Sequence, residues 1–253
     1  MAGPAGRLDA VFVCGGRWHD FDYARLGVLT MLGEHEHVRT RVFEDYATNG
    51  ALPGADVLVT YTCDVRPDPT QQAELADFLA RGGRWLALHA TNAAIDPPSE
   101  PGGRFSASPE LGIAHLLGSK FRGHPPIVPY RVEVSDPGHP LIEGIGPFTV
   151  SDELYVSEVA GDLDVILHAD YVGDCPGFVD ARAVIARQPV LYTRSFGEGT
   201  VCYFTLGHCR GRFDIQDLGV EDLERVDRGS WSSMEFRTVL SRCVAWVAGG
   251  SGV

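Results

Sequence analysis

The sequence predicts an α/β fold with a central, mainly parallel β-sheet and helices on both of its faces. Segments with strand and helix patterns alternate through the first two-thirds of the 253 residues, and this order is typical of right-handed crossovers between parallel strands. Several strand segments are apolar almost without interruption, which indicates burial on both faces of the sheet. We expect residues 8–248 to form one domain, with an antiparallel addition in its second half.

The N-terminal segments predict a strand, a helix and a second strand. Asp9–Cys14 is a short run of β-forming residues that stops at two glycines. Phe21–Leu32 carries apolar residues at helical spacing, and Asp20 is placed to cap its N-terminus. Val38–Phe43 alternates apolar residues with Arg and Thr, so we expect a half-exposed strand near an edge of the sheet.

The next segments repeat this order with stronger strand signals. Ala55–Tyr61 is apolar enough for a buried strand, and Thr70 is placed to cap a helix that runs through Leu79. Two glycines then end that helix. Arg84–Leu88 is a second buried strand, and it runs into a small-residue turn at His89, where we expect another helix to begin.

The second half of the chain predicts a loop, two helices and four strands. The stretch 96–104 holds three prolines and two glycines, so we expect an exposed loop and a candidate lid. Pro109–Leu117 and Trp231–Val247 have helical patterns, and the second is amphipathic. The predicted strands, with a hairpin turn between the last two, are Tyr130–Val134, Leu163–Ala169, Val190–Arg194 and Thr200–Leu206.

The composition excludes several classes of function. A net charge of −13 makes binding to nucleic acid or to an anionic membrane unfavourable. No stretch reaches the roughly 18 apolar residues of a membrane span, and the N-terminus lacks the pattern of a signal peptide. The six cysteines form no CxxC pair, so we expect buried, reduced thiols. These features predict a cytoplasmic protein.

Polar residues follow the ends of several predicted strands. His19 comes shortly after the first strand, His89 directly after Leu88, and His208 two residues after Leu206. A lone histidine in such a position is more often structural than catalytic, so each signal is weak by itself. However, the carboxyl ends of parallel strands open on one edge of the sheet, where α/β folds bind ligands. We therefore expect these side chains to meet in one cleft.

The turn at His89 is the position where α/β hydrolases and related enzymes often place a nucleophile. Here it holds an imidazole instead of the Cys or Ser that nucleophilic catalysis requires. We therefore expect the scaffold of a hydrolase or amidotransferase with a different chemistry.

Short motifs occur along the chain in a characteristic order. They are Gly16-Arg17 with His19-Asp20, Ala87-Leu88-His89-Ala90, Leu116-Leu117-Gly118, Phe121 leading to His124-Pro125, Asp136 with His139-Pro140, Asp152-Glu153-Leu154-Tyr155, Pro189-Val190, Gly197-Glu198-Gly199-Thr200-Val201 and Leu206-Gly207-His208. With these motifs the chain resembles the ThuA-like family, named for trehalose utilisation, within the class I glutamine amidotransferase-like superfamily. The resemblance runs from about Leu8 to Arg210 and continues through the last helix.

The resemblance implies a flavodoxin-like three-layer α/β/α sandwich. In glutamine amidotransferases the residue at the turn is a cysteine, so the histidine at position 89 implies that this activity is absent. ThuA-like proteins are associated with disaccharide catabolism, near oxidoreductases that make 3-keto sugars. The implied substrate is therefore a small carbohydrate or polyol-like molecule, such as a keto-sugar.

The resemblance and the strand ends together assign the candidate site. The candidate catalytic residues are His89, His124, Glu153 and His208. The candidate substrate-binding residues are Gly16, Arg17, His19, Asp20 and Tyr155. A divalent metal, zinc or manganese, is expected at His89, His124 and His208, unless these histidines act without metal as a general acid–base pair. The structural alternatives are a simple helix cap for Asp20 and ordinary loop positions for His124 and Glu153.

Three functions stay open at this point. The first is a lyase, hydrolase or isomerase in which histidine removes a proton next to a keto group. The second is a non-catalytic carbohydrate-binding or regulatory protein, which needs no base with a shifted pKa. The third is a cysteine hydrolase, which needs a thiol within reach of His89 or His208. The segments 96–104 and 173–188 depart from the family pattern, which leaves the substrate open, and the sequence also leaves open whether the chain forms a homo-oligomer.

Overall fold

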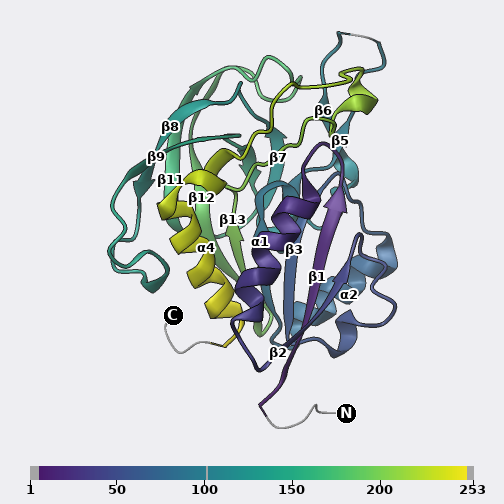
Figure 1. Cartoon of the computed structure of the whole chain (residues 1–253), viewed down its shortest axis with the longest axis vertical. Coiled ribbons are helices and arrows are strands. Elements are labelled where there is room, and N and C mark those ends of the chain that lie inside the picture. Colours follow the sequence, from purple (N-terminus) through teal and green to yellow (C-terminus); the bar gives the residue numbers. More distant parts are fainter. Residues whose placement is uncertain (1–5, 101, 250–253) are drawn as a thin grey trace.

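The computed structural model describes residues 6–100 and 102–249, and a nine-stranded sheet runs through its centre (Figure 1). The strands lie in the order β2-β1-β3-β4-β13-β12-β11-β8-β9. Their bounds are β1 Leu8–Gly16, β2 Val38–Phe43, β3 Val57–Cys63, β4 Arg84–Leu88, β8 Val128–Val134, β9 Phe148–Asp152, β11 Asp164–Gly173, β12 Val184–Phe196 and β13 Gly199–Phe204.

The sheet has a parallel half and an antiparallel half. β1 pairs in parallel with β2 and β3, and β4 pairs in parallel with β3 and β13. Each of the four pairings that lead from β13 to β9 is antiparallel. Because four reversals restore the original direction, β9 runs the same way as the parallel strands. The predicted α/β fold is confirmed, and its antiparallel half is larger than expected.

Helices cover both faces of the parallel half. Their bounds are α1 Phe21–Gly33, α2 Pro69–Ala80, α3 Ala114–Leu117 and α4 Met234–Val247. Neighbouring residues of a strand point into different layers: Phe12 belongs to the apolar core beneath α1 and α4, whereas Val13 belongs to the core beneath α2 and α3. The result is the flavodoxin-like three-layer sandwich that the resemblance implied.

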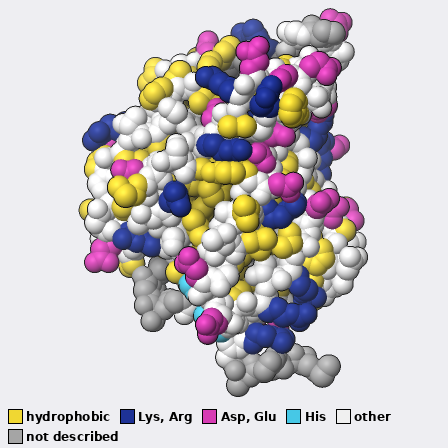
Figure 2. Space-filling view, in the orientation of Figure 1, with side chains coloured by type: hydrophobic (Ala, Val, Ile, Leu, Met, Phe, Trp, Pro, Cys, Tyr) yellow, Lys and Arg dark blue, Asp and Glu magenta, His cyan; other side chains and the backbone are white. Residues whose placement is uncertain are grey.

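The face covered by α1 and α4 carries a mixture of side chains. Figure 2 shows hydrophobic side chains in the middle of this face, with acidic and basic side chains interspersed around them. The exposed apolar residues of the two helices include Leu26 and Met234. Among the residues that the structure describes, no helix has the length and apolar character needed to cross a membrane.

Two pairs of short strands lie outside the large sheet. β5 Ile95–Asp96 pairs with β6 Ser106–Ala107, and β7 Ser119–Gly123 pairs with β10 Val156–Val159. Both pairings are antiparallel. None of these strands was predicted, because runs this short carry too few residues to establish a period of two.

The N-cap of α2 is Asp68, so the prediction of Thr70 was wrong. The Asp68 carboxylate accepts hydrogen bonds from the backbone N–H groups of Thr70 and Gln71, at 2.8 and 2.9 Å. The Gln71 side chain accepts a hydrogen bond from the Asp68 N–H in return, at 2.9 Å. This capping box satisfies backbone groups at the first turn from both sides, which a threonine inside that turn cannot do.

Three predicted helices begin later or are shorter than expected. His89–Asn92 is a single 3₁₀ turn and not the start of a longer helix. The predicted helix 109–117 is interrupted by Gly112, whose φ of +70° ends one short turn before α3 begins. The final helix begins at Met234, because Trp231 belongs to a separate 3₁₀ turn that precedes it.

Candidate functional site

Three histidines meet at the carboxyl edge of the parallel strands. His19 follows β1, His89 follows β4 and His208 follows β13, and their ring centroids lie 4.8, 5.2 and 5.7 Å apart. His89 has a φ of +45°, in the left-handed region that residues other than glycine rarely adopt. The sharp turn expected after β4 is therefore present, and it holds a fully buried imidazole.

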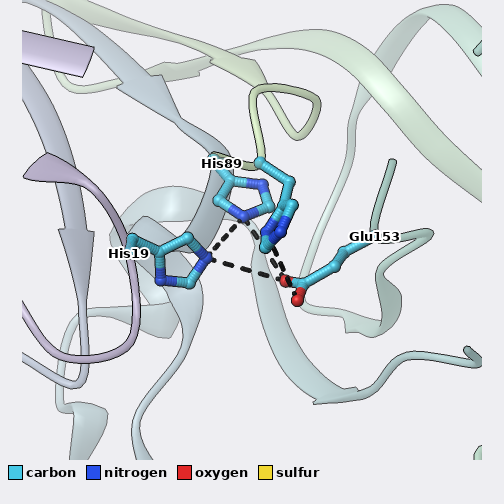
Figure 3. A group of neighbouring side chains, drawn as sticks. His19, His89 and Glu153 are labelled. Atoms are coloured by element: carbon cyan, nitrogen blue, oxygen red, sulfur yellow. Dashed lines mark hydrogen bonds and ion pairs between the residues drawn. The ribbon is translucent and has the colours of Figure 1, made fainter. Parts of the chain in front are cut away.

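A carboxylate reaches the histidines from the antiparallel half of the sheet. Glu153 directly follows β9, whose carboxyl end lies at the same edge because its direction matches that of the parallel strands. Its Oε1 lies 3.3 Å from Nδ1 of His208. Its Oε2 lies 3.5 Å from Nε2 of His89 and 3.7 Å from Nε2 of His19 (Figure 3). We call His19, His89, Glu153 and His208 the His–Glu cluster, and all four are buried.

Hydrogen bonds to the backbone fix the tautomers of two histidines. Nδ1 of His89 lies 3.0 Å from the Thr205 carbonyl oxygen, and Nδ1 of His19 lies 3.1 Å from the Arg17 carbonyl oxygen. A carbonyl oxygen only accepts, so each Nδ1 must carry the hydrogen. Each neutral ring then presents an unprotonated Nε2, and these two atoms lie 2.9 Å apart. Two lone pairs at this distance repel unless a proton or a metal ion lies between them.

His208 lacks the hydrogen bonds that a buried imidazole normally makes. Both of its ring nitrogens are buried without a hydrogen-bond partner among the described residues. Nδ1 lies 3.3 Å from Oε1 of Glu153, which is an ion pair when the ring is protonated. Buried polar atoms without partners are uncommon and indicate an unfilled role, such as binding an ion.

The charges in the cluster are strongly coupled. Burial would raise the pKa of Glu153, but the nearby His124 and His208 hold it well below its usual value, so the carboxylate is ionised. Burial would lower the pKa of His208, but attraction by Glu153 outweighs it and raises this pKa. For His19, burial dominates and lowers the pKa to about 3. A proton on His19 is therefore unfavourable near neutral pH.

The donor set of the cluster fits a divalent metal. One ligand atom from each of the four residues lies within 4.8 Å of the others. Imidazole nitrogen and carboxylate oxygen are ligands that zinc accepts and that also suit manganese. The carbonyl groups that receive the Nδ1–H of His19 and His89 resemble the outer partners of metal-bound histidines. His19 belongs to this group, whereas His124 lies outside it.

Three further side chains surround the carboxylate of Glu153. Nε2 of His124 lies 3.6 Å from Oε1, and Nη2 of Arg210 donates a hydrogen bond to the same oxygen at 3.1 Å. The Tyr155 hydroxyl lies 3.5 Å from Oε2 and 3.4 Å from Nε2 of His89. The predicted residues His89, His124, Glu153, Tyr155 and His208 are thus brought together, with His19 among them.

A cavity of about 220 Å³ opens next to the cluster. Its polar lining comes from His19, His124, Glu153 and Arg210, and most of the remaining wall is aromatic or aliphatic. The apolar lining residues are Trp18, Ile95, Phe105, Phe121, Phe178, Ile215 and Leu218. Such a mainly apolar pocket with a few convergent polar groups is typical of a small-molecule site.

Three of the predicted substrate-binding residues do not line this cavity. A Cβ added at Gly16 would lie 1.9 Å from the Cys63 carbonyl oxygen, so the glycine permits close packing of β1 against β3. Arg17 forms an ion pair with Asp217 at 2.5 Å. Asp20 caps α1, which agrees with its structural alternative. A binding role for any of the three stays a prediction.

Asp152, which lies directly before Glu153, has a role that was not predicted from the sequence. This buried carboxylate accepts hydrogen bonds from the N–H groups of Ser230, Gly207 and His208, at 2.9, 3.1 and 3.2 Å. It also accepts one from the N–H of Glu153 at 2.8 Å. Asp152 therefore holds two members of the His–Glu cluster through their backbone. Its position beside Glu153 was the signal that could have identified it.

The described cysteines are not placed for nucleophilic catalysis. Cys63 lines the cavity, but burial raises the pKa of its thiol well above the usual value. Burial also raises the pKa of Cys209 to about 12, and this thiol contacts the Tyr61 hydroxyl. Within the described residues, no thiol forms a hydrogen bond with His89 or His208. The cysteine-hydrolase hypothesis therefore lacks support.

Comparisons with known proteins address the family and the fold. A family model described as ThuA, trehalose utilisation, matches residues 10–219. Among solved structures, a putative ThuA-like protein from Parabacteroides merdae has 15% identity and a TM-score of 0.62, covering 98% of this chain and 92% of that one. A second, from Bacteroides uniformis, has 16% identity and a TM-score of 0.63, covering 98% and 94%. A cytoplasmic protein from Salmonella typhimurium has 12% identity and a TM-score of 0.53, covering 95% and 99%. No curated protein matches the chain.

The fold and the site define a flavodoxin-like α/β protein with a buried His–Glu cluster at the carboxyl edge of its sheet. The family model covers most of the chain, and the chain therefore belongs to the ThuA family. The solved structures share its fold, which is all that their low sequence identity supports.

Proposed function

We propose that this protein is an enzyme that acts on a keto-sugar or a related sugar-derived molecule by histidine acid–base chemistry, with the assistance of a divalent metal. The observation that carries the proposal is the 2.9 Å approach of Nε2 of His19 to Nε2 of His89. Both Nδ1–H groups are already donated to the backbone, so a metal ion beside Glu153 would relieve the repulsion between the facing lone pairs. Together with His208, these residues would hold zinc or manganese.

The residues around the cluster suit proton removal next to a keto group. A bound divalent metal would supply a Lewis acid that stabilises negative charge on a substrate oxygen. A keto group acidifies the neighbouring C–H bond, and His124 is the base best placed to remove that proton. It lines the cavity, faces Glu153 and lies outside the metal-binding group. Loss of the proton permits β-elimination of a glycosidic group or isomerisation through an enediol.

Two neighbours complete the proposed site. Burial raises the pKa of Tyr155 well above its usual value, so its hydroxyl stays protonated and can donate a hydrogen bond to a substrate oxygen. Arg210 donates to Oε1 of Glu153 at 3.1 Å and so favours the ionised carboxylate.

More general observations support the class of substrate and the location of the protein. The family description, trehalose utilisation, supports a carbohydrate-related small molecule. The aromatic cavity supports a ligand with apolar ring faces. All six cysteines are free and buried, which supports a cytoplasmic location.

Metal analysis tests the metal-binding part of this proposal. We expect the purified protein to contain zinc or manganese, chelation to abolish turnover of 3-keto-glycosides, and added metal to restore it. His19→Ala, His89→Ala and His208→Ala should each lower metal occupancy, whereas the exposed His115→Ala should not. Unchanged occupancy in all three cluster variants would contradict the assignment.

Turnover measurements test the acid–base part. We expect His124→Ala to keep its metal and to lose about 10²–10⁴-fold in turnover, the usual effect of removing a general acid or base. A non-catalytic carbohydrate-binding protein is the second candidate, because an imidazole occupies the turn where related enzymes carry their nucleophile. Binding of keto-glycosides to the metal-loaded protein without turnover would favour this alternative.

A further inference from the structure

Two loops that are far apart in the sequence build one side of the cavity. The loop between β5 and β6 contributes Phe105, and the loop between β11 and β12 contributes Gly177 and Phe178. The N–H of Phe105 donates to the Gly177 carbonyl, and the N–H of Val179 donates to the Phe105 carbonyl, both at 2.9 Å. Each loop therefore holds the other in place.

Phe178 lies where these loops meet the rest of the cavity. Its ring centroid is 5.9 Å from that of Phe105, 5.3 Å from that of Phe121 and 5.0 Å from that of His124. A Cβ added at Gly123 would lie 2.9 Å from the Cβ of Phe178, so this side chain is packed closely against β7. We call Phe105 and Phe178 the aromatic wall.

The aromatic wall restricts the space next to the His–Glu cluster. The cavity of about 220 Å³ is smaller than the roughly 300–1,000 Å³ that sites for drug-sized ligands provide. Aromatic rings can pack against the C–H faces of one sugar ring, while His124, Glu153 and Arg210 can bind oxygens along its edge. A volume of about 220 Å³ leaves little space to enclose a second sugar ring beside the first.

We propose that the aromatic wall makes the site selective for single-ring, sugar-derived substrates, and that Phe178 sets the size limit. This selectivity rests on the proposed function, because it concerns the ligand that reaches the same His–Glu cluster. Because Phe178 lines the cavity where the two loops meet, truncation of this side chain would enlarge the enclosed space and admit a second ring.

Cys63 provides a test of the size limit that needs neither metal nor turnover. It is the cysteine that lines the cavity, and the ratio of two reagents at one pH cancels the effect of the raised pKa of its thiol, because both react with the same thiolate. In the wild-type protein, methyl methanethiosulfonate should label Cys63 faster than the bulky aromatic disulfide DTNB, as read by peptide mass spectrometry. Phe178→Ala should raise the ratio of bulky to small labelling about tenfold, the lower end of the effects that pocket size has on selection.

Two further variants make the labelling result decisive. Phe213→Ala is the matched control, because Phe213 is 56% exposed and does not line the cavity. Phe178→Leu retains apolar packing and replaces the alanine variant if that variant does not fold. It should also raise the ratio of bulky to small labelling, but by less than Phe178→Ala. A ratio unchanged by substitution of Phe178, or equal labelling of the wild-type protein by both reagents, would overturn the size limit.

Two sugar probes test the selectivity itself. With metal-loaded protein, kcat/KM should be at least about tenfold higher for methyl 3-keto-glucoside, which has one ring, than for 3-keto-trehalose, which has two. Phe178→Ala should narrow this difference, and equal values in the wild-type protein would overturn the selectivity. If neither probe reacts but the labelling ratio responds to Phe178, the proposed function fails while the size limit stands.

Discussion

His19 and His89 each use Nδ1 to hold a backbone carbonyl and direct Nε2 toward the other. Protonation of His19 would relieve the repulsion between the two Nε2 lone pairs, but burial disfavours it and lowers the pKa of His19 to about 3. In the absence of metal, His19 therefore lowers the free energy of unfolding by an amount that depends on pH. The unfolded chain binds a proton at His19 near pH 6.5, whereas the folded protein does not bind it until about pH 3.

The metal-free protein should lose stability as the pH falls below 6.5. Between pH 6.5 and 5, His19 alone should lower the free energy of unfolding by roughly 2 kcal/mol. His208 does not offset this loss, because a raised pKa gives a contribution that is already complete below the unfolded pKa. The contribution of Glu153 is lost only at more acid pH, because its pKa is lowered. Urea unfolding at the two pH values measures the change.

The variant His19→Gln separates this effect from the other histidines. Its free energy of unfolding should fall less between pH 6.5 and 5 than that of the wild-type protein. His115→Gln, at an exposed position, is the control and should keep the wild-type slope. Equal slopes for all three proteins would show that His19 is not held neutral.

Asp152 is expected to act as a positioning residue for the cluster. Asp152→Asn replaces one acceptor oxygen with an NH₂ group that faces backbone N–H donors, so Glu153 and His208 should lose their fixed positions. We expect zinc affinity to fall about 10–100-fold, as for other outer partners of metal ligands. Competition with a chromophoric chelator measures this. Asp136→Asn, which changes an exposed carboxylate that also accepts a backbone N–H, should leave zinc affinity unchanged.

At the scale of elements, the end of β1 depends on close contact between backbones. A Cβ at Gly16 would meet the Cys63 carbonyl oxygen at 1.9 Å, and the φ of +124° disfavours any side chain. Gly16→Ala should therefore cost roughly 2–6 kcal/mol of stability, from overpacking and backbone strain together. Gly50→Ala is the matched control, because its φ is also positive at +74° but its Cβ would have no neighbour within 4 Å.

Thermal unfolding of the two glycine variants distinguishes the cost of overpacking from the cost of backbone strain. The control should lose only the cost of the backbone conformation, about 1–3 kcal/mol. If Gly16→Ala lowers the melting temperature no more than Gly50→Ala does, β1 and β3 can separate without penalty and the close contact is not required.

Strands with an unbroken apolar run, such as β3, or with a clear alternation, such as β2, were the ones that the sequence could predict. All seven residues of β3 are buried, so its composition alone indicates a central strand. β7 alternates buried and half-buried residues, and β9 alternates buried and exposed ones, in each case over only five positions, which is too short a run to distinguish from a loop. For this reason Glu153 was expected in a flanking loop, although it follows a strand of the main sheet.

From strand order alone, the candidate site could be predicted only where parallel strands carry it, whereas His124 and Glu153 were assigned to it through the family motifs. His89 and His208 follow β4 and β13, and their shared edge follows from the parallel pairing of these strands. The roles of Phe105 and Phe178 could not be predicted, because they depend on hydrogen bonds between two loops with no strand pattern. The catalytic and binding roles assigned from the sequence stay predictions.

At the scale of the whole molecule, metal binding should stabilise the folded chain. Free zinc at about 100 times its Kd adds about 2.7 kcal/mol to the free energy of unfolding, provided that the unfolded chain does not bind it. For a chain of this size, that corresponds to a rise in melting temperature of roughly 5–10 °C. A single transition is expected, because the sequence predicts that residues 8–248 form one domain.

Scanning calorimetry with and without zinc measures this shift. The triple variant in which His19, His89 and His208 are each replaced by Ala should show no rise on addition of zinc. A rise of the same size in this variant would indicate that zinc binds elsewhere and would remove the thermal support for the His–Glu cluster.

β9 runs in the direction of the parallel strands because an odd number of antiparallel strands, β12, β11 and β8, lies between it and β13. The position of Glu153 therefore depends on that number staying odd. Insertion or deletion of one antiparallel strand would carry the end of β9, and Glu153 with it, to the opposite edge of the sheet. A whole hairpin adds two strands and would leave Glu153 at the edge where the histidines lie. In evolution or design, this half of the protein can therefore grow or shrink by hairpins, but not by single strands, without separating the carboxylate from its histidines.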